Sequence, residues 1–250
     1  MRNLFFTLLF LFLSSIAVAD GYSYAQLSDG TIEITSYDGE EIELSIPATI
    51  DSLTVTKIGD GAFLTSSISS VIIPEGVTEI GEATFSMCSS LSSVTLPSTL
   101  KALGKHAFSI CPNLTAITLP DGLTSIGPYA FHASALTSIT LPENLTYIGE
   151  AVFKSCTSLT NLTLPKNITE IPESLCEGCS SLVSASIPNN ATKIGGWAFS
   201  GCTSLTSFTI PDSVTEIGTS AFFSCPALKI AATSDYAKEY CKENELELRI

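Results

Sequence analysis

Short segments in which apolar and polar residues alternate recur along most of this chain. In residues 136–142, LTSITLP, the apolar Ile139 and Leu141 alternate with Ser138 and Thr140, which predicts a β-strand with one buried and one exposed side. Proline has no N–H for the strand ladder and ends each such segment. The prolines are separated by 27, 23, 23, 22, 23, 23 and 23 residues, and they are Pro47, Pro74, Pro97, Pro120, Pro142, Pro165, Pro188 and Pro211. This spacing indicates an internal repeat.

Three further positions keep the same period. An Ile-Gly pair or a close variant occupies residues 58–59, 80–81, 103–104, 126–127, 148–149, 171–172, 194–195 and 217–218. Four residues after the pair comes Phe63, Phe85, Phe108, Phe131, Phe153, Phe199 or Phe222, and Cys176 takes this place after Ile171-Pro172. Three residues further on are Cys88, Cys111, Cys156, Cys179, Cys202 and Cys225, whereas Ser66 and Ser134 follow Phe63 and Phe131.

Each repeat therefore holds a one-sided strand, a second short extended segment, and a turn that carries inward-facing Phe and Cys. One repeat cannot bury its apolar side alone, but stacked repeats form a continuous core. We therefore expect a single α/β-type, mostly β repeat solenoid. It should have one parallel sheet of short strands, second short extended segments and short helical turns. About eight units of period 23 fill residues 46–230.

The repeat resembles the BspA-like class of leucine-rich repeats, with its pattern L-x-x-I-x-I-P-x-x-V-T-x-I-G-x-x-A-F-x-x-C. The ends are similar to that class as well. Residues 20–45 contain a strand and turn, TIEITSYDG, typical of the amino-terminal β cap, and residues 231–250 resemble the carboxy-terminal cap, with a polar helix from Ser234 to Asn244 and a last strand. The resemblance implies a secreted or surface-exposed protein used for adhesion, with no catalytic residues and no cofactor.

The amino terminus predicts export. Arg2 precedes an apolar run from Leu4 to Leu13, and Ala17-Val18-Ala19 stands before Asp20. This is the layout of a cleaved signal peptide over residues 1–19, whereas the run is short for a transmembrane anchor. We therefore expect a protein that is secreted or on the cell surface, in an extracellular or periplasmic compartment, with no stable membrane insertion after cleavage.

The charge excludes one class of partner. The chain has 11 basic and 25 acidic residues and a net charge of −14, which becomes −15 when Arg2 leaves with the leader. A protein this acidic repels phosphate backbones, so nucleic acid is not an expected partner.

Eight cysteines in an exported chain normally suggest disulfides, but six of them share one position of the repeat. Their side chains should run parallel, about 4.8 Å apart, rather than converge as a disulfide requires. We therefore expect a stack of buried thiols. Cys176 and Cys179 form a C-x-x-C, but Cys176 stands at a core position and no second ligand pair is spaced for zinc. Cys241 lies outside the register and is expected to be the most accessible thiol.

No motif points to an enzyme or a metal site. His106 and His132 fall at non-equivalent positions of adjacent repeats, and the sequence contains no G-x-S-x-G, H-E-x-x-H or phosphate-binding glycine motif. Histidines on the surface are the simplest expectation, and no catalytic, metal or cofactor-binding residue is assigned.

The outward positions of the main strand are small, uncharged and mostly hydroxylated, so they form a candidate contact surface. The residues are Ser93, Thr95, Thr118, Ser138, Thr140, Asn161, Thr163, Ser184, Ser186, Ser207 and Thr209. Such a face would suit weak, multivalent contact with an extracellular protein or glycan. β-propensity and solvation explain the same residues equally well. The alternative is a purely structural or self-associating surface or spacer protein with no external ligand.

Five N-x-S/T sequons are present, at Asn113, Asn144, Asn161, Asn167 and Asn190. In a eukaryotic secretory route such asparagines would carry glycan, whereas in a bacterium they carry no such meaning. A repeat rich in Leu-Thr also produces these triplets wherever asparagine precedes it.

Overall fold

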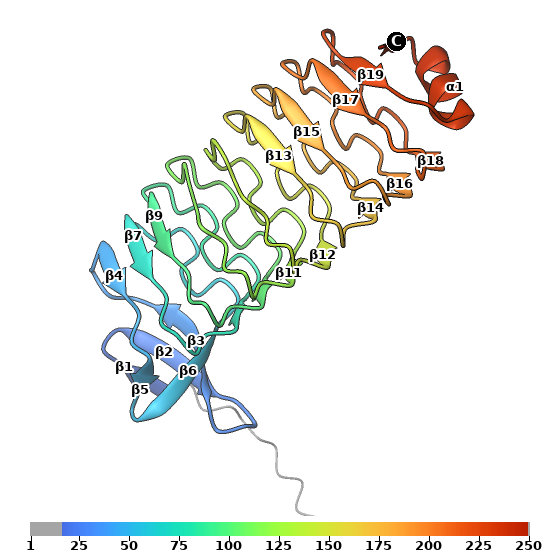
Figure 1. The fold of residues 1–250 in the computed structure, drawn as a ribbon. Coiled ribbons are helices and arrows are strands. Elements are labelled where there is room, and N and C mark those ends of the chain that lie inside the picture. Colours follow the sequence, from blue (N-terminus) through green and yellow to red (C-terminus); the bar gives the residue numbers. More distant parts are fainter. Residues whose placement is uncertain (1–16, 250) are drawn as a thin grey trace, which may run out of the picture.

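The computed structural model describes residues 17–249, which form an elongated solenoid with parallel sheets along two sides and little helix (Figure 1). The expected fold class is confirmed. Two details differ from the expectation, because the second extended segments also pair into a parallel sheet and the turns are not helical. The signal peptide expected at residues 1–19 lies almost wholly outside the described residues.

The first sheet is made by the one-sided strands, and we call its outer surface the hydroxyl face. It consists of two parallel blocks, separated by two repeats in which no strand forms. Across the gap Thr137 N–H still donates to Thr115 O at 3.0 Å, and Thr160 N–H to Thr137 O at 3.1 Å. The first block is β4 (Glu43–Ser45), β7 (Ser70–Ile72) and β9 (Ser93–Thr95). The second is β13 (Asn161–Thr163), β15 (Ser184–Ser186), β17 (Ser207–Thr209), β19 (Lys229–Ala231) and β20 (Glu247–Leu248).

The Ile-Gly segments form the second sheet, along the other side of the solenoid, and we call its outer surface the charged face. Each strand is only two residues long, except β6. One block holds β6 (Leu53–Ile58), β8 (Glu79–Ile80), β10 (Ala102–Leu103), β11 (Ser125–Ile126) and β12 (Tyr147–Ile148). The other holds β14 (Glu170–Ile171), β16 (Lys193–Ile194) and β18 (Glu216–Ile217), so the sheet is divided between β12 and β14.

The glycine of each Ile-Gly pair is required by close stacking of the repeats. A Cβ on Gly127 would lie 2.6 Å from the nitrogen of Lys105, and one on Gly195 would lie 2.5 Å from the nitrogen of Glu173. Real Cβ atoms do not approach backbone this closely, because the atoms would overlap. Any other residue at this position must push neighbouring repeats apart.

The expected short helical turns are instead built from paired left-handed residues. In one repeat these are Ala83 (φ 53°) and Met87 (φ 59°), and every repeat has two such residues four positions apart. In this backbone geometry the N–H of every second residue points along the solenoid axis, toward the next repeat. The N–H groups of Ala83, Phe85 and Met87 accordingly donate to carbonyls of the next repeat at 2.7–2.9 Å. Hydrogen bonding between repeats thus favours a conformation that L-residues otherwise avoid.

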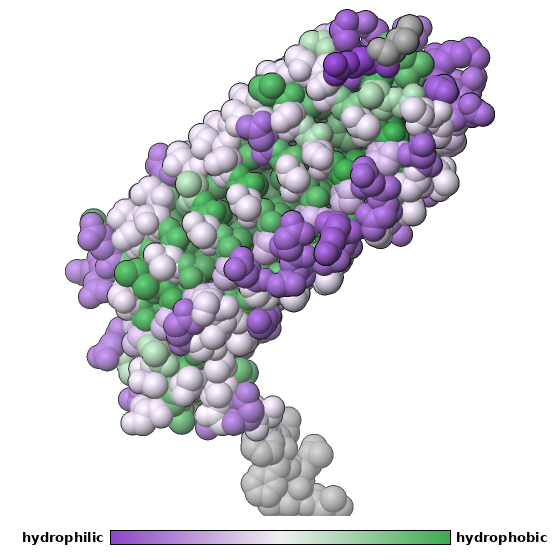
Figure 2. Space-filling model, viewed as in Figure 1, coloured by the Kyte–Doolittle hydropathy of each residue, from purple (hydrophilic) through white to green (hydrophobic). Residues whose placement is uncertain are grey.

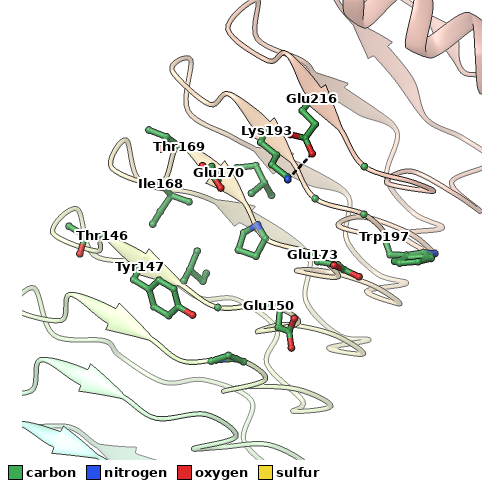
Figure 3. A pocket seen from close by; sticks show the side chains of 18 of the residues that line it. Thr146, Tyr147, Glu150, Ile168, Thr169, Glu170, Glu173, Lys193, Trp197 and Glu216 are labelled. Carbon is green, nitrogen blue, oxygen red and sulfur yellow. Dashed lines mark ion pairs between the residues drawn. The ribbon is translucent and has the colours of Figure 1, made fainter.

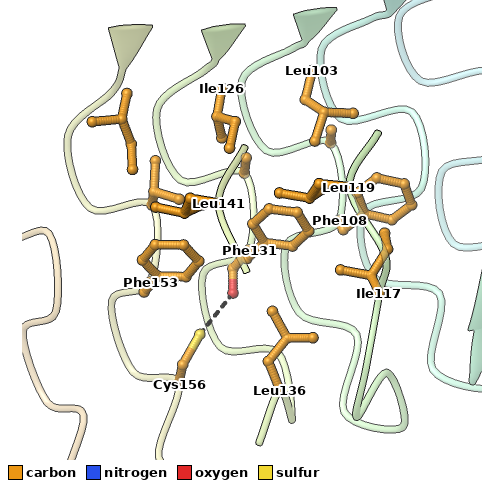
Figure 4. Packing of buried hydrophobic residues seen from close by; sticks show 14 of the residues in the cluster. Leu103, Phe108, Ile117, Leu119, Ile126, Phe131, Leu136, Leu141, Phe153 and Cys156 are labelled. Atoms are coloured by element: carbon orange, nitrogen blue, oxygen red, sulfur yellow. Dashed lines mark hydrogen bonds between the residues drawn. The ribbon is translucent and has the colours of Figure 1, made fainter. Parts of the chain in front are cut away.

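Phenylalanines from successive turns stack through the core (Figure 4). The rings of Phe63, Phe85, Phe108, Phe131 and Phe153 lie parallel, with centroids 5.1, 5.3, 5.8 and 5.9 Å apart. The column stops at the repeat with Cys176 and resumes with a Phe199–Phe222 pair 5.7 Å apart. The same repeat therefore interrupts both the aromatic column and the second sheet.

Antiparallel strands close the amino-terminal end. β1 (Ala17–Ala19), β2 (Tyr22–Gln26) and β3 (Ile32–Tyr37) pair in this order, and β3 then pairs with β6. The long first interval between prolines is a hairpin of β5 (Thr49–Ile50) with β6, whose tip has positive φ at Asp51 and Ser52. The hairpin thus adds the residues that lengthen this repeat.

The other end is covered by α1 (Asp235–Glu243), followed by β20. Ser234 caps the helix, since its side chain accepts a hydrogen bond from Ala237 N–H at 3.2 Å. Ala237 and Cys241 are fully buried on the inner side of the helix. The expectation that Cys241 is the most accessible thiol is therefore wrong, because the thiol packs against the last repeat instead of facing solvent.

Candidate interaction surfaces

All eleven residues predicted for the contact surface are exposed on the hydroxyl face. Pairing places Asn161, Ser184 and Ser207 in one row across neighbouring strands. Within that row Ser184 Oγ donates to Asn161 Oδ1 at 2.6 Å. Figure 2 shows this edge of the molecule as mostly pale, whereas hydrophilic residues gather along the charged face. The eleven predicted residues are thus small and uncharged. The same face also carries Ile72, which is 51% exposed, and Arg249, which lines a hollow together with Ser207 and Thr209.

Four of the five sequon asparagines hold repeats together. Asn144, Asn167 and Asn190 stand two residues after the strand-ending proline, and each donates from Nδ2 to a carbonyl of the preceding repeat, at 3.0, 2.8 and 3.1 Å. Asn113 does the same from another position, to Ser89 O at 2.7 Å. Only Asn161 lies on the hydroxyl face. The sequon asparagines thus have a structural explanation within the array.

The repeated cysteines are free thiols, and they are buried. Their sulfurs do not face one another. Cys88 Sγ instead donates to Phe63 O at 3.1 Å, and Cys156 Sγ to Phe131 O at 3.0 Å. Burial raises the pKa of the Cys156 thiol to about 12, so it stays protonated at neutral pH. The position therefore needs a small apolar side chain that can donate one weak hydrogen bond.

The two histidines lie close together at the edge of the turns, where both contact Tyr129. The His106 ring stacks on Tyr129 with centroids 4.9 Å apart, and His132 Nδ1 lies 3.2 Å from Ser109 Oγ. Both rings are half-buried rather than freely exposed, and burial lowers the pKa of each. Within residues 17–249 no group of three or more His, Cys, Asp or Glu side chains is placed to hold a metal ion.

A groove of about 840 Å³ lies on the carboxy-terminal part of the charged face (Figure 3). It runs from Pro128 to Thr219 and crosses the division between β12 and β14. Two exposed aromatic side chains line it, namely Tyr147, which is 53% exposed, and Trp197, which is 42% exposed, and Figure 3 shows them on opposite sides of the groove. Sequence reasoning assigned no function to these residues.

Pro172 explains the division of the sheet. In the adjoining repeats Gly149 N–H donates to Ile126 O, and Gly195 N–H to Ile171 O, both at 2.8 Å. Pro172 occupies the equivalent position but has no N–H, and its ring stands where a Cβ would contact the preceding repeat. Within residues 17–249 the Ile148 carbonyl consequently accepts no backbone hydrogen bond.

Comparison with known proteins identifies the array. The sequence profile described as "BspA type Leucine rich repeat region" matches residues 56–183 and 169–244, in six copies. The chain belongs to this BspA-type leucine-rich repeat family. None of the curated proteins compared with the sequence matches it.

Solved structures similar to this BspA-type protein are bacterial. A leucine-rich repeat protein from Bacteroides ovatus has a TM-score of 0.70 and 28% identity, over 87% of this chain and 71% of that one. The T. pallidum leucine-rich repeat protein has a TM-score of 0.70 and 26% identity, over 94% and 98%. A leucine rich cell surface protein from Faecalibacterium prausnitzii has a TM-score of 0.64 and 34% identity, over 88% of this chain and 55% of that one.

The charge of this BspA-type array is unevenly balanced along the charged face. At the amino-terminal end Lys57 Nζ lies 3.5 Å from Glu33 and 3.3 Å from Glu79, and Lys105 pairs with Glu82 at 3.4 Å. The groove is lined by four carboxylates and one ammonium group, which are Glu150, Glu170, Glu173, Glu216 and Lys193.

Lys193 cannot neutralise this excess. Its Nζ lies 2.7 Å from Glu216, and that carboxylate raises the pKa of Lys193. Within residues 17–249 no ion pair forms to Glu150, Glu170 or Glu173. The groove therefore keeps a net charge of about −3 at neutral pH.

The groove could have been suspected from the sequence only where residues depart from the repeat pattern. Pro172 and Cys176 break the pattern in one repeat. In the next repeat Gly196, which has no side chain, precedes the large Trp197. Trp197 occupies the left-handed turn position, where Ala83 and Ala151 stand in other repeats. Its side chain is 42% exposed, whereas Ala151 at the equivalent position is fully buried.

Proposed function

We propose that this chain is a non-enzymatic binding module of a secreted or cell-surface protein, and that it contacts an extracellular macromolecule through the groove. One observation carries the proposal, namely the two exposed aromatic side chains that line the groove, Tyr147 and Trp197. Trp and Tyr are the residue types that contribute most to protein interfaces, and a concave site buries more of a ligand than a flat one.

The relatives support the coarser part of this proposal. One structural neighbour is described as a leucine rich cell surface protein. Within residues 17–249 no helix is long and apolar enough to cross a membrane. The predicted leader would deliver the chain to the same side of the membrane as a surface protein.

The hydroxyl face is a second candidate contact surface. Its eleven predicted residues are exposed, and those on β13, β15 and β17 form rows across the strands. These eleven residues include no Trp, Tyr or Arg, so they would serve weak contact with many equivalent points rather than one tight site. A purely structural role, with contacts only between copies of the chain, is the alternative to both.

Peptide and glycan arrays probed with the labelled full chain test the proposal. Trp197→Ala should lower the apparent affinity about 30-fold, the effect of losing a 2 kcal/mol hot spot. The variant should fold normally, because alanine occupies the same turn position at residues 83 and 151 with the same positive φ.

Two matched variants separate the surfaces. Phe223→Ala removes another exposed aromatic, 65% accessible and outside the groove, and should leave binding unchanged. Ser184→Asp combined with Ser207→Asp alters only the hydroxyl face. Loss of binding in this double variant, with Trp197→Ala still active, would assign the function to the hydroxyl face. No binding to either array would favour the structural role.

A further inference from the structure

We propose that the groove binds a cationic, extended segment of polypeptide through its Lys and Arg side chains. This inference rests on the proposed function and specifies the ligand class of the same site. Three features of the groove carry it, and they are its unpaired carboxylates, its unpaired backbone carbonyls and its two aromatic rings.

The carboxylates require a positive ligand. Glu150, Glu170 and Glu173 are exposed and form no ion pair within residues 17–249. The one lysine in the groove already lies 2.7 Å from Glu216. A Lys or Arg from a partner would supply the missing counter-charge. The acidic chain, with a sequence pI of about 4.4, would attract such a partner from a distance.

The backbone of the groove also presents acceptors. In the regular repeats the carbonyls equivalent to Thr146 O and Ile148 O accept N–H groups from the next repeat; Thr192 N–H, for example, donates to Thr169 O at 2.8 Å. Within residues 17–249 neither Thr146 O nor Ile148 O accepts a backbone bond, and both residues line the groove. A ligand rich in N–H donors would satisfy them.

The aromatic rings suit the same ligand. In Figure 3 Glu150 and Glu173 lie between the Tyr147 and Trp197 rings. A guanidinium group that stacks on an aromatic face gains a cation–π contact, and its five N–H donors can bind a neighbouring carboxylate at the same time. Arginine therefore fits the groove better than lysine.

These features favour a polypeptide over a neutral glycan. Each sugar hydroxyl has one donor and two acceptor lone pairs, whereas Lys and Arg side chains only donate. The groove crosses four steps between repeats, about 20 Å at strand spacing. An extended peptide of about six residues spans that length.

Tryptophan fluorescence provides a direct test, because Trp197 is the single tryptophan of the chain. The full chain is titrated with a peptide of repeated Arg-Ser-Gly units, about twelve residues long so that it spans the groove. We expect saturable change in Trp emission, and affinity that falls at least about tenfold between 0.05 and 0.5 M NaCl. Peptides with Gln or Glu in place of Arg should leave the emission unchanged.

Charge variants locate the contact. Glu150→Gln combined with Glu173→Gln should weaken Arg-peptide binding about tenfold, as for the loss of two solvent-accessible ion pairs. Glu40→Gln combined with Glu41→Gln makes the same change in net charge on exposed residues outside the groove, and affinity should change less than about twofold, because only screened long-range attraction is lost.

Three results would overturn the inference. They are equal binding of the Gln and Arg peptides, equal weakening by the two double variants, and an emission change with a neutral oligosaccharide but not with the Arg peptide. The last result would leave the proposed function intact, because the groove would still bind a macromolecule. Both proposals would be wrong if the groove bound neither probe and the full chain bound nothing on the peptide and glycan arrays.

Discussion

The charged face differs on the two sides of Pro172. On the amino-terminal side the strands pair without interruption from β3 to β12, and Lys57 and Lys105 neutralise neighbouring glutamates. On the carboxy-terminal side the sheet starts again at β14, and carboxylates outnumber cations in the groove. Regular contacts between repeats thus use polar groups within the solenoid, whereas the contact at Pro172 leaves polar groups of the two adjoining repeats free for a ligand.

The core shows the same contrast. Phe131 stacks on Phe108 and Phe153, but Phe153 has an aromatic neighbour on one side only, because Cys176 takes the next position. The irregular repeat therefore weakens the aromatic column where it opens the sheet. The loss of the phenylalanine at Cys176 thus accompanies the loss of the glycine at Pro172, and both residues lie next to the groove.

The largest expected effect is on the aromatic column. Phe153→Ala should lower the free energy of unfolding by about 3–5 kcal/mol, the range for truncating a buried aromatic side chain. Phe131→Ala should cost at least as much, because it removes two stacked contacts instead of one. Denaturant unfolding followed by circular dichroism measures both. Phe223→Ala, on an exposed ring, is the control and should change stability by less than about 0.5 kcal/mol. A Phe153 variant as stable as this control would contradict the column.

The next prediction concerns the rate at which the buried thiols react. Burial raises the pKa of Cys111 and Cys156 from 9.0 to about 12, which lowers the thiolate fraction at pH 8 about 1000-fold. Native protein should therefore react with a thiol reagent at least that much more slowly than denatured, unreduced protein. All eight thiols should be released on unfolding, including Cys241. Absence of free thiols in the denatured chain would show cross-links that this structure does not contain.

Much of the fold could be predicted from the sequence, because the period places Ile, Phe and Cys at repeating core positions. The turn conformation could not be predicted. Its left-handed positions are filled by residues such as Ala83 and Met87, which give no local signal, and hydrogen bonds between repeats stabilise them. The hydroxyl face was predictable from strand alternation. The groove was not, because it depends on how Pro172 changes the contact between two repeats.

Restoring the pattern at Pro172 should close the groove. Pro172→Gly returns an N–H that can donate to Ile148 O and removes the ring that separates the repeats. The new hydrogen bond, about 1 kcal/mol, and the greater entropy of glycine in the unfolded chain, also about 1 kcal/mol, should nearly cancel in stability. Arg-peptide affinity should fall about tenfold, as for the charge variants.

Hydrogen exchange distinguishes this closure from a general disturbance. The new amide at residue 172 should be protected to the same degree as that of Gly195. Pro112→Gly, at an exposed proline outside the groove, makes a similar entropy change and should leave peptide affinity unaltered. An unprotected amide at residue 172, with peptide affinity retained, would mean that Pro172 does not hold the groove open.

The smallest effect concerns the asparagines that link neighbouring repeats. Asn167→Ala removes the hydrogen bond to Glu143 O and should lower the free energy of unfolding by about 1 kcal/mol. Asn167→Ser should recover most of this loss, because Ser213 occupies the equivalent position and donates to Asn189 O at 2.8 Å. Asn161→Ala, on the hydroxyl face, should change stability by less than about 0.5 kcal/mol, since Asn161 contacts only exposed hydroxyl groups. Equal stability of all three variants would show that the asparagine amides bond to water as readily as to the preceding repeat.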